Sequence, residues 1–198
     1  IKMIEALNLD QIYKVTNKYQ TDRIIGILFA RYDTSKNLIE PNYDFWNKLT
    51  SAHFDIFLAG YGAYLSPDEQ TSRKKIISFS DSNEKGIYFD NDAYISVVKK
   101  FKNELKSFKY DDSVPLLVLL DTENGIIKWS KPLIIKLSDS SKGYSLSRSF
   151  ICKISDLTSQ FYYLSDIWYT LKRYEIRKRI TNSVSLSDII ALIALLKP

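Results

Sequence analysis

Apolar residues along the chain follow two patterns, which together predict alternating strands and helices. Continuous apolar runs of strand length are typical of strands covered on both faces, and they occur at 23–33, 54–62 and 113–125. Apolar residues at helical spacing predict amphipathic helices at 4–19, 40–53 and 89–108. The order of these elements predicts parallel strands joined by helical crossovers.

Shorter elements fill the remainder of this part of the chain. The polar excursion 66–86 surrounds one apolar patch, Ile76, Ile77 and Phe79, which predicts a short strand. Gly125 in the sequence ENG predicts a hairpin turn, because such turns require positive φ. Further strands are predicted in the sequences IIKW, PLIIKL and RSFICKI, with Pro132 at the start of one of them.

The C-terminal part of the chain is helical in pattern. Helical spacing of apolar residues predicts a helix over 157–180, and a second helix follows the sequence TNS. Residues 189–196 are apolar on every side, yet this run is far shorter than the roughly 20 residues of a membrane span. We therefore expect them to be buried against the body of the chain, a second copy or another protein. The predicted domains are an α/β core, 1–155, and a C-terminal helical extension, 156–198.

This order of elements predicts a three-layer α/β sandwich with a mostly parallel central sheet, an antiparallel hairpin at one side and a C-terminal helical pair. It resembles the thioredoxin-like fold, in which a proline, usually cis, precedes the strand beside the active site; Val114–Pro115 holds the comparable place. The family's CxxC would follow the first long strand, where the sequence reads RYDTSKN. The resemblance therefore implies a relative without redox activity that is used for binding. Other three-layer parallel α/β folds remain alternatives.

The composition excludes several classes of site. The 198 residues include one cysteine, Cys152, and one histidine, His53, which rules out a Cys/His zinc site, a CxxC pair and a disulfide framework. Cys152 is expected to be a buried, inert thiol, and His53 to lie at a helix end. The lone cysteine and the absence of a signal-peptide pattern predict a cytoplasmic protein, and the abundance of Lys, Ile, Asn and Tyr suggests a bacterial source.

Three carboxylates are candidates for chemistry. In a parallel sheet, ligands collect where strands end, and the predicted strands deliver Asp33, Asp121 and Glu123 there. Carboxylates that meet in this way can hold Mg²⁺ or Mn²⁺ with a phosphate oxygen, which suits a phosphoesterase or nuclease. The alternative is structural: acids at strand ends can simply keep the start of a loop solvated, and Asp121 can accept hydrogen bonds from the following backbone N–H groups in an Asx turn.

Positive charge is concentrated near the C-terminus. The net charge is +5, and the segment 171–180 carries Lys172 and four further cations against Glu175 alone, the four being Arg173, Arg177, Lys178 and Arg179. Such a cluster attracts phosphates, and neighbouring aromatic residues could stack on bases, so nucleic-acid binding is one hypothesis. The alternative is a solvated helix face, with the aromatic residues in the core.

The leading hypothesis is a non-catalytic interaction or accessory domain that acts through protein–protein contacts or as an oligomer, with no cofactor and no membrane contact. It rests on the apolar helix 189–196 and on the absence of a catalytic set. The metal-dependent phosphoesterase and the nucleic-acid-binding protein are the alternatives.

Overall fold

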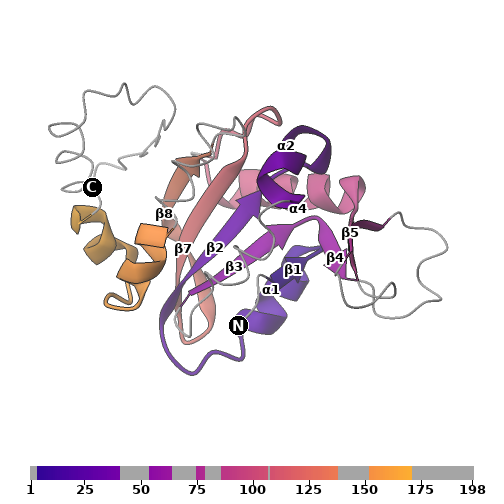
Figure 1. Cartoon of the computed structure of the whole chain (residues 1–198). Helices are drawn as coiled ribbons and strands as arrows, with labels where there is room; N and C mark the ends of the chain where they lie inside the picture. The colour runs from indigo at the N-terminus through magenta and orange to yellow at the C-terminus, as the bar shows by residue number, and fades with distance from the viewer. Residues whose placement is uncertain are drawn as a thin grey trace, which may run out of the picture.

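A five-stranded sheet forms the centre of the computed structural model, which describes residues 4–40, 54–63, 75–78, 86–106, 108–137 and 152–170 (Figure 1). The strand order is β1-β3-β2-β7-β8. The bounds are Ile4–Ala6 for β1, Arg23–Phe29 for β2, Phe54–Ala59 for β3, Leu116–Glu123 for β7 and Ile126–Lys136 for β8. The prediction of an α/β protein is therefore confirmed.

The sheet is mixed, so the prediction of a mostly parallel sheet is wrong. Strands β1, β3 and β2 are parallel, whereas β7 runs antiparallel to β2 and β8 antiparallel to β7. In the β2–β7 pair, Arg23 lies opposite Thr122 and Phe29 opposite Leu116. A buried apolar run has the same composition whichever way it points, so the pattern of 113–125 could not reveal its direction.

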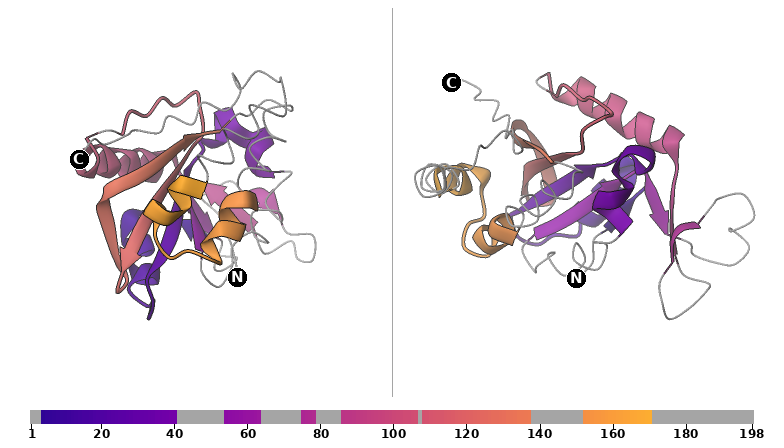
Figure 2. Two further views of the ribbon diagram at one scale, coloured as in Figure 1. Left: turned by 90° about the vertical axis from the view of Figure 1, so that its left-hand side faces the viewer. Right: turned by 45° about the horizontal axis from the view of Figure 1, so that its top comes forward.

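Helices cover both faces of the sheet, and the side chains of the central strands alternate between two apolar clusters. Ile25, Ile27 and Phe29 of β2 face helices α1 (Leu9–Thr16) and α4 (Asn91–Glu104). Ile24 and Leu28 face α2 (Tyr32–Ile39) and two further helices, 152–158 and 164–170. Figure 2 shows α4 on one side of the sheet and the C-terminal helices on the other. Burying both faces explains why β2 and β3 carry almost no polar residues.

A second, smaller sheet is built from the chain between β3 and α4. Its strand order is β4-β6-β5, with bounds Tyr61–Ala63, Gly86–Phe89 and Lys75–Ser78, and both pairings are antiparallel. The predicted strand around Ile77 is confirmed, whereas β4 and β6 were not predicted. Gly60 connects the two sheets: its φ is +79°, its N–H donates to the carbonyl of Ala6, and its carbonyl accepts from the N–H of Asp90.

Local sequence signals account for several element boundaries. Asp90 caps α4 by accepting a hydrogen bond from the N–H of Ala93 at 2.9 Å. Asn8 caps α1 in the same way through the N–H of Gln11. Asn124 and Gly125 both have positive φ, as the predicted two-residue turn between β7 and β8 requires. The helix predicted over 89–108 and the hairpin are thus confirmed.

Other predicted elements differ from the structure. The stretch 4–19 contains β1 before α1, and three residues are too few to show the alternation of a strand. The sequence around Cys152, predicted as a strand, begins helix 152–158. The helix predicted from 157 is interrupted at 159–163 before helix 164–170. The predicted helices 40–53 and 189–196 lie outside the described residues, apart from Glu40. In the part of the chain described, no helix has the length and apolar character needed to span a bilayer.

We predict that Gly60→Ala destabilises the fold by about 2–4 kcal/mol, because the new Cβ would lie 2.6 Å from the Cβ of Tyr94 and the φ of +79° strains any L-residue. Urea denaturation followed by far-UV circular dichroism measures the change. The control is Asn124→Gly. Residue 124 has a φ of 49°, which glycine adopts without strain, and the substitution adds no atom that could clash. The urea midpoint of this variant should therefore be unchanged or raised. Equal midpoints for Gly60→Ala and the wild type would contradict the prediction.

Candidate functional site

The three predicted carboxylates do not meet at one edge of the sheet. Asp33 lies in the first turn of α2, beyond the C-terminal end of β2, whereas Asp121 pairs with Ile24 at the opposite end of β2. Ile24 and Phe29 alone are about 17 Å apart at roughly 3.3 Å per residue. Two ligands of one Mg²⁺ ion, each about 2.0–2.1 Å from the metal, lie only about 4 Å apart or closer. The predicted convergence is wrong because β7 is antiparallel to β2.

Asp121 and Glu123 have structural partners at their edge. Asp121 Oδ1 accepts a hydrogen bond from the backbone N–H of Leu164 at 2.8 Å, and Glu123 Oε2 lies 2.6 Å from Lys128 Nζ. Within the residues described, no three His, Cys, Asp or Glu side chains are grouped so that they could hold a metal ion. Asp121 thus has a structural partner, as the alternative expected, but the partner is 43 residues away and is not a following N–H of an Asx turn.

The edge where β1, β3 and β2 end carries a small polar group around Arg31. Arg31 precedes α2 and makes no side-chain cap, and its guanidinium lies 3.9 Å from the carboxylate of Asp33 and 3.8 Å from that of Asp112. Both carboxylates are well exposed, so these ion pairs contribute little to stability. We call this group the strand-end site.

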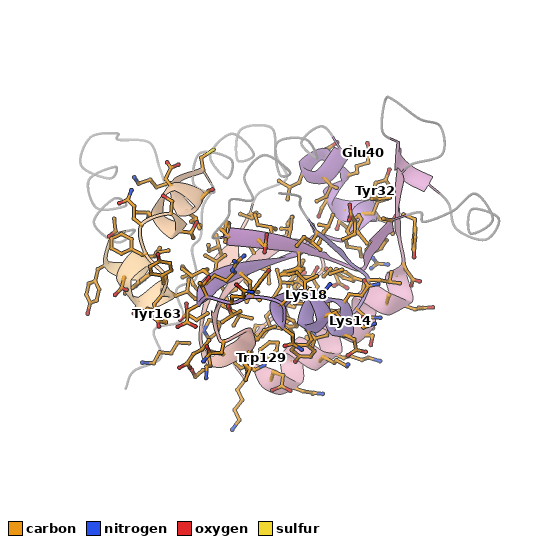
Figure 3. The ribbon with its side chains drawn as sticks, turned by 90° about the horizontal axis from the view of Figure 1, so that it is seen from below. Lys14, Lys18, Tyr32, Glu40, Trp129 and Tyr163 are labelled. Carbon is orange, nitrogen blue, oxygen red and sulfur yellow. The ribbon has the colours of Figure 1, made fainter. Side chains whose placement is uncertain are left out.

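Hydroxyl groups complete the strand-end site. Thr34 Oγ1 donates to the backbone carbonyl of Asp112 at 3.1 Å, which joins α2 to the loop before Pro115. The Tyr32 hydroxyl donates to Glu40 Oε1, and this bond, with a smaller effect of burial, raises the pKa of Tyr32 to about 12 (Figure 3). Ser35 is fully buried. The described residues here include no thiol and no hydroxyl paired with a histidine.

The opposite edge anchors the C-terminal helices to the sheet. Asp22 accepts hydrogen bonds from the N–H of Asn124 at 3.0 Å and from the hydroxyl of Tyr163 at 2.7 Å, and both bonds lower the pKa of Asp22. Burial raises the pKa of Asp121, and the bond from Leu164 opposes this shift. Leu164 is the first residue of helix 164–170, so Asp121 satisfies an N–H that the helix cannot satisfy itself. We call Asp22 and Asp121 the tail anchor.

One polar cluster was not predicted from the sequence. Asp55, in β3, is 8% exposed and accepts from the Tyr19 hydroxyl and from Arg23 Nη1 at 3.4 Å. The guanidinium of Arg23 also lies 3.9 Å from the centre of the Tyr19 ring, a cation–π contact. Burial is the main cause of a raised pKa of Tyr19. The single aspartate inside the apolar run FDIFLAG was the available signal, since a buried charge requires a partner.

The remaining candidate residues are placed as follows. Cys152 is a free, half-buried thiol in the first turn of helix 152–158, so the prediction of a buried strand position is wrong. His53 lies outside the described residues. So do the cations proposed for binding: Arg173, Arg177, Lys178 and Arg179.

If Asp121 acts as a helix cap, Asp121→Ala should destabilise the protein by about 1–2 kcal/mol, because the N–H of Leu164 loses its acceptor. Asp121→Asn keeps an acceptor oxygen. Since the raised pKa means that the ionised carboxyl is penalised in the folded state, the neutral amide should leave stability at pH 7 unchanged or raised. Urea midpoints of the two variants test this, and equal losses for Asn and Ala would contradict it.

The lowered pKa of Asp22 predicts a pH dependence of stability that is opposite in sign to the one expected from the raised pKa of Asp121. Its ionised form is favoured by folding, so its contribution to stability is present above its ordinary pKa of 3.8 and is lost as the pH falls through the lower folded value. The stability difference between wild type and Asp22→Ala should therefore shrink between pH 5 and pH 3. Urea midpoints at both pH values measure it, and a constant difference would show that the carboxylate charge has no part in the anchor.

No family model matches the sequence, no characterised protein matches it, and no solved structure matches the fold.

Proposed function

We propose that the chain is a thioredoxin-like domain without thiol chemistry that acts as a non-catalytic interaction domain. The observation that carries the proposal is the composition of the strand-end site. In the resemblance described above, the redox motif would follow β2, and here the start of α2 holds Arg31, Asp33 and Thr34 and no cysteine. Thr34 contacts the loop before Pro115 through the carbonyl of Asp112, which joins the two segments that flank the family's active site.

The order of elements supports the thioredoxin-like assignment, and two features depart from it. The chain forms β1, α1, β2, α2 and β3 in this order. After the excursion that holds the smaller sheet come α4 and the antiparallel hairpin of β7 and β8. The peptide bond before Pro115 is trans, whereas the family's proline is usually cis. The excursion also forms a three-stranded sheet of its own.

Thiol–disulfide exchange within this chain would need a second cysteine. Cys152 is the only one, and it lies in a helix far along the chain from the start of α2. The geometry gives no support to the metal-dependent phosphoesterase, because Asp33 lies beyond one end of β2 and Asp121 beside the other. Nucleic-acid binding through 171–180 stays a prediction, since that segment lies outside the described residues.

The C-terminal part supplies the proposed contact. Leu164 and Ile167 are buried in the cluster on the α2 face of the sheet, so helix 164–170 is fixed to the core. The chain continues beyond it with 28 further residues, 171–198, which include the wholly apolar run 189–196. An all-apolar helix contributes to stability only when it is covered, at about 25 cal/mol per Å² of apolar surface. A second copy or a protein partner would supply that cover.

Deletion of residues 183–198 tests this role. We predict that the full chain self-associates or binds its partner at micromolar concentration, and that the shortened chain does neither while its urea denaturation stays cooperative, which shows that the core is folded. Sedimentation velocity measures the mass. Cys152→Ser is the control and should associate as the wild type does, because no thiol takes part. A full-length chain that sediments as a monomer, together with a shortened chain that still binds its partner, would contradict the proposal.

A further inference from the structure

The C-terminal helices present an exposed aromatic surface beside the tail anchor. The exposed fractions are 53% for Tyr162, 44% for Tyr163 and 73% for Tyr169. Ile126, at the start of β8, is 62% exposed and lies opposite Glu123 in the hairpin. We call these four residues, together with Asp166, the tyrosine face. Figure 3 places Tyr163 on the opposite side of the molecule from Tyr32 of the strand-end site.

The aromatic residues of this segment have separate roles. Leu164 and Ile167 are buried and Phe161 and Trp168 are half-buried, all four packing against the α2-side cluster of the sheet. Tyr169 points away from that cluster, and Asp166, three residues earlier on helix 164–170, is also exposed. Packing of this helix against the sheet therefore does not explain the exposed ring of Tyr169, and tyrosine is among the residues enriched in protein interfaces.

Among the residues that the structure describes, the charges around the tyrosine face are mostly negative, although the whole chain carries a net charge of +5. Asp22 accepts from the Tyr163 hydroxyl, and Asp121 and Glu123 also act electrostatically on that tyrosine. Asp166 acts in turn on Asp121. Within the described part of the chain, Lys128 is the cation that acts on Asp22, and its Nζ lies 2.6 Å from Glu123 Oε2. An arrangement of four carboxylates repels phosphates and attracts cations.

We propose that the tyrosine face binds an arginine- and lysine-rich polypeptide segment of a protein partner. Guanidinium groups stack on tyrosine rings and pair with carboxylates, so one side chain can use both features of the surface. The negative charge of the described carboxylates favours such a segment over nucleic acid as the occupant of this surface. This inference rests on the proposed interaction role and names one class of partner. It does not involve residues 183–198, so its failure and that of the deletion experiment are distinguishable.

The test is titration of the full-length protein with a synthetic decapeptide of alternating arginine and glycine, measured by isothermal calorimetry at 20 mM and 200 mM NaCl. We expect binding that weakens at the higher salt. Asp166→Lys and Tyr169→Ser should each weaken it by about tenfold or more, and Tyr169→Phe should keep it, because stacking needs only the ring.

Asp10→Lys is the matched control. Asp10 is exposed and lies in the first turn of the short helix α1. The substitution Asp10→Lys changes the net charge by the same amount as Asp166→Lys. It should change the affinity by less than about twofold, and far-UV circular dichroism checks that every variant is folded. The proposal is overturned if the arginine peptide does not bind at low salt, if Asp10→Lys and Asp166→Lys weaken binding equally, or if decathymidylate binds more tightly than the peptide.

Discussion

Seven antiparallel residue pairs join β2 to β7, from Arg23 with Thr122 to Phe29 with Leu116. This pairing decides which end of the sheet each polar group occupies. The residues that follow β2 form the strand-end site, whereas those that end β7 reach the start of β2, where they anchor the C-terminal helices. A parallel β7 would instead have brought Asp33 and Asp121 to one edge. The separation of the strand-end site from the tail anchor follows from the direction of one strand.

Burial of the sheet on both faces holds this arrangement in place. Side chains of β2, β3 and β7 alternate between two clusters of fully buried residues, so slippage of β7 by one residue would move its apolar side chains to the wrong face. Phe29 illustrates the packing on one face, where its ring centre lies 4.8 Å from that of Phe101 and 5.1 Å from that of Phe108. On the other face, Leu164 and Ile167 complete the core, and Asp121 fixes the start of their helix.

The sequence was sufficient to predict strong local signals and insufficient for relations between distant segments. The α4 helix, the buried runs and the Asn124–Gly125 turn follow from capping residues, periodicity and positive φ, all of which are local. The direction of β7, the bond from Leu164 to Asp121 and the Asp55 cluster depend on residues 32 or more positions apart, and the sequence does not show which of these residues meet. The meeting proposed for the candidate carboxylates required a strand direction that composition does not encode.

The distance between Asp33 and Glu123 tests the central claim most directly. Both side chains are well exposed, at 73% and 53%, so cysteines there can carry spin labels in a Cys152→Ser background without disturbing the core. Double electron–electron resonance then measures the label separation in solution. An antiparallel β7 predicts more than about 20 Å, the length of β2 at roughly 3.3 Å per residue. A separation below about 15 Å would place both carboxylates at one edge and contradict the account.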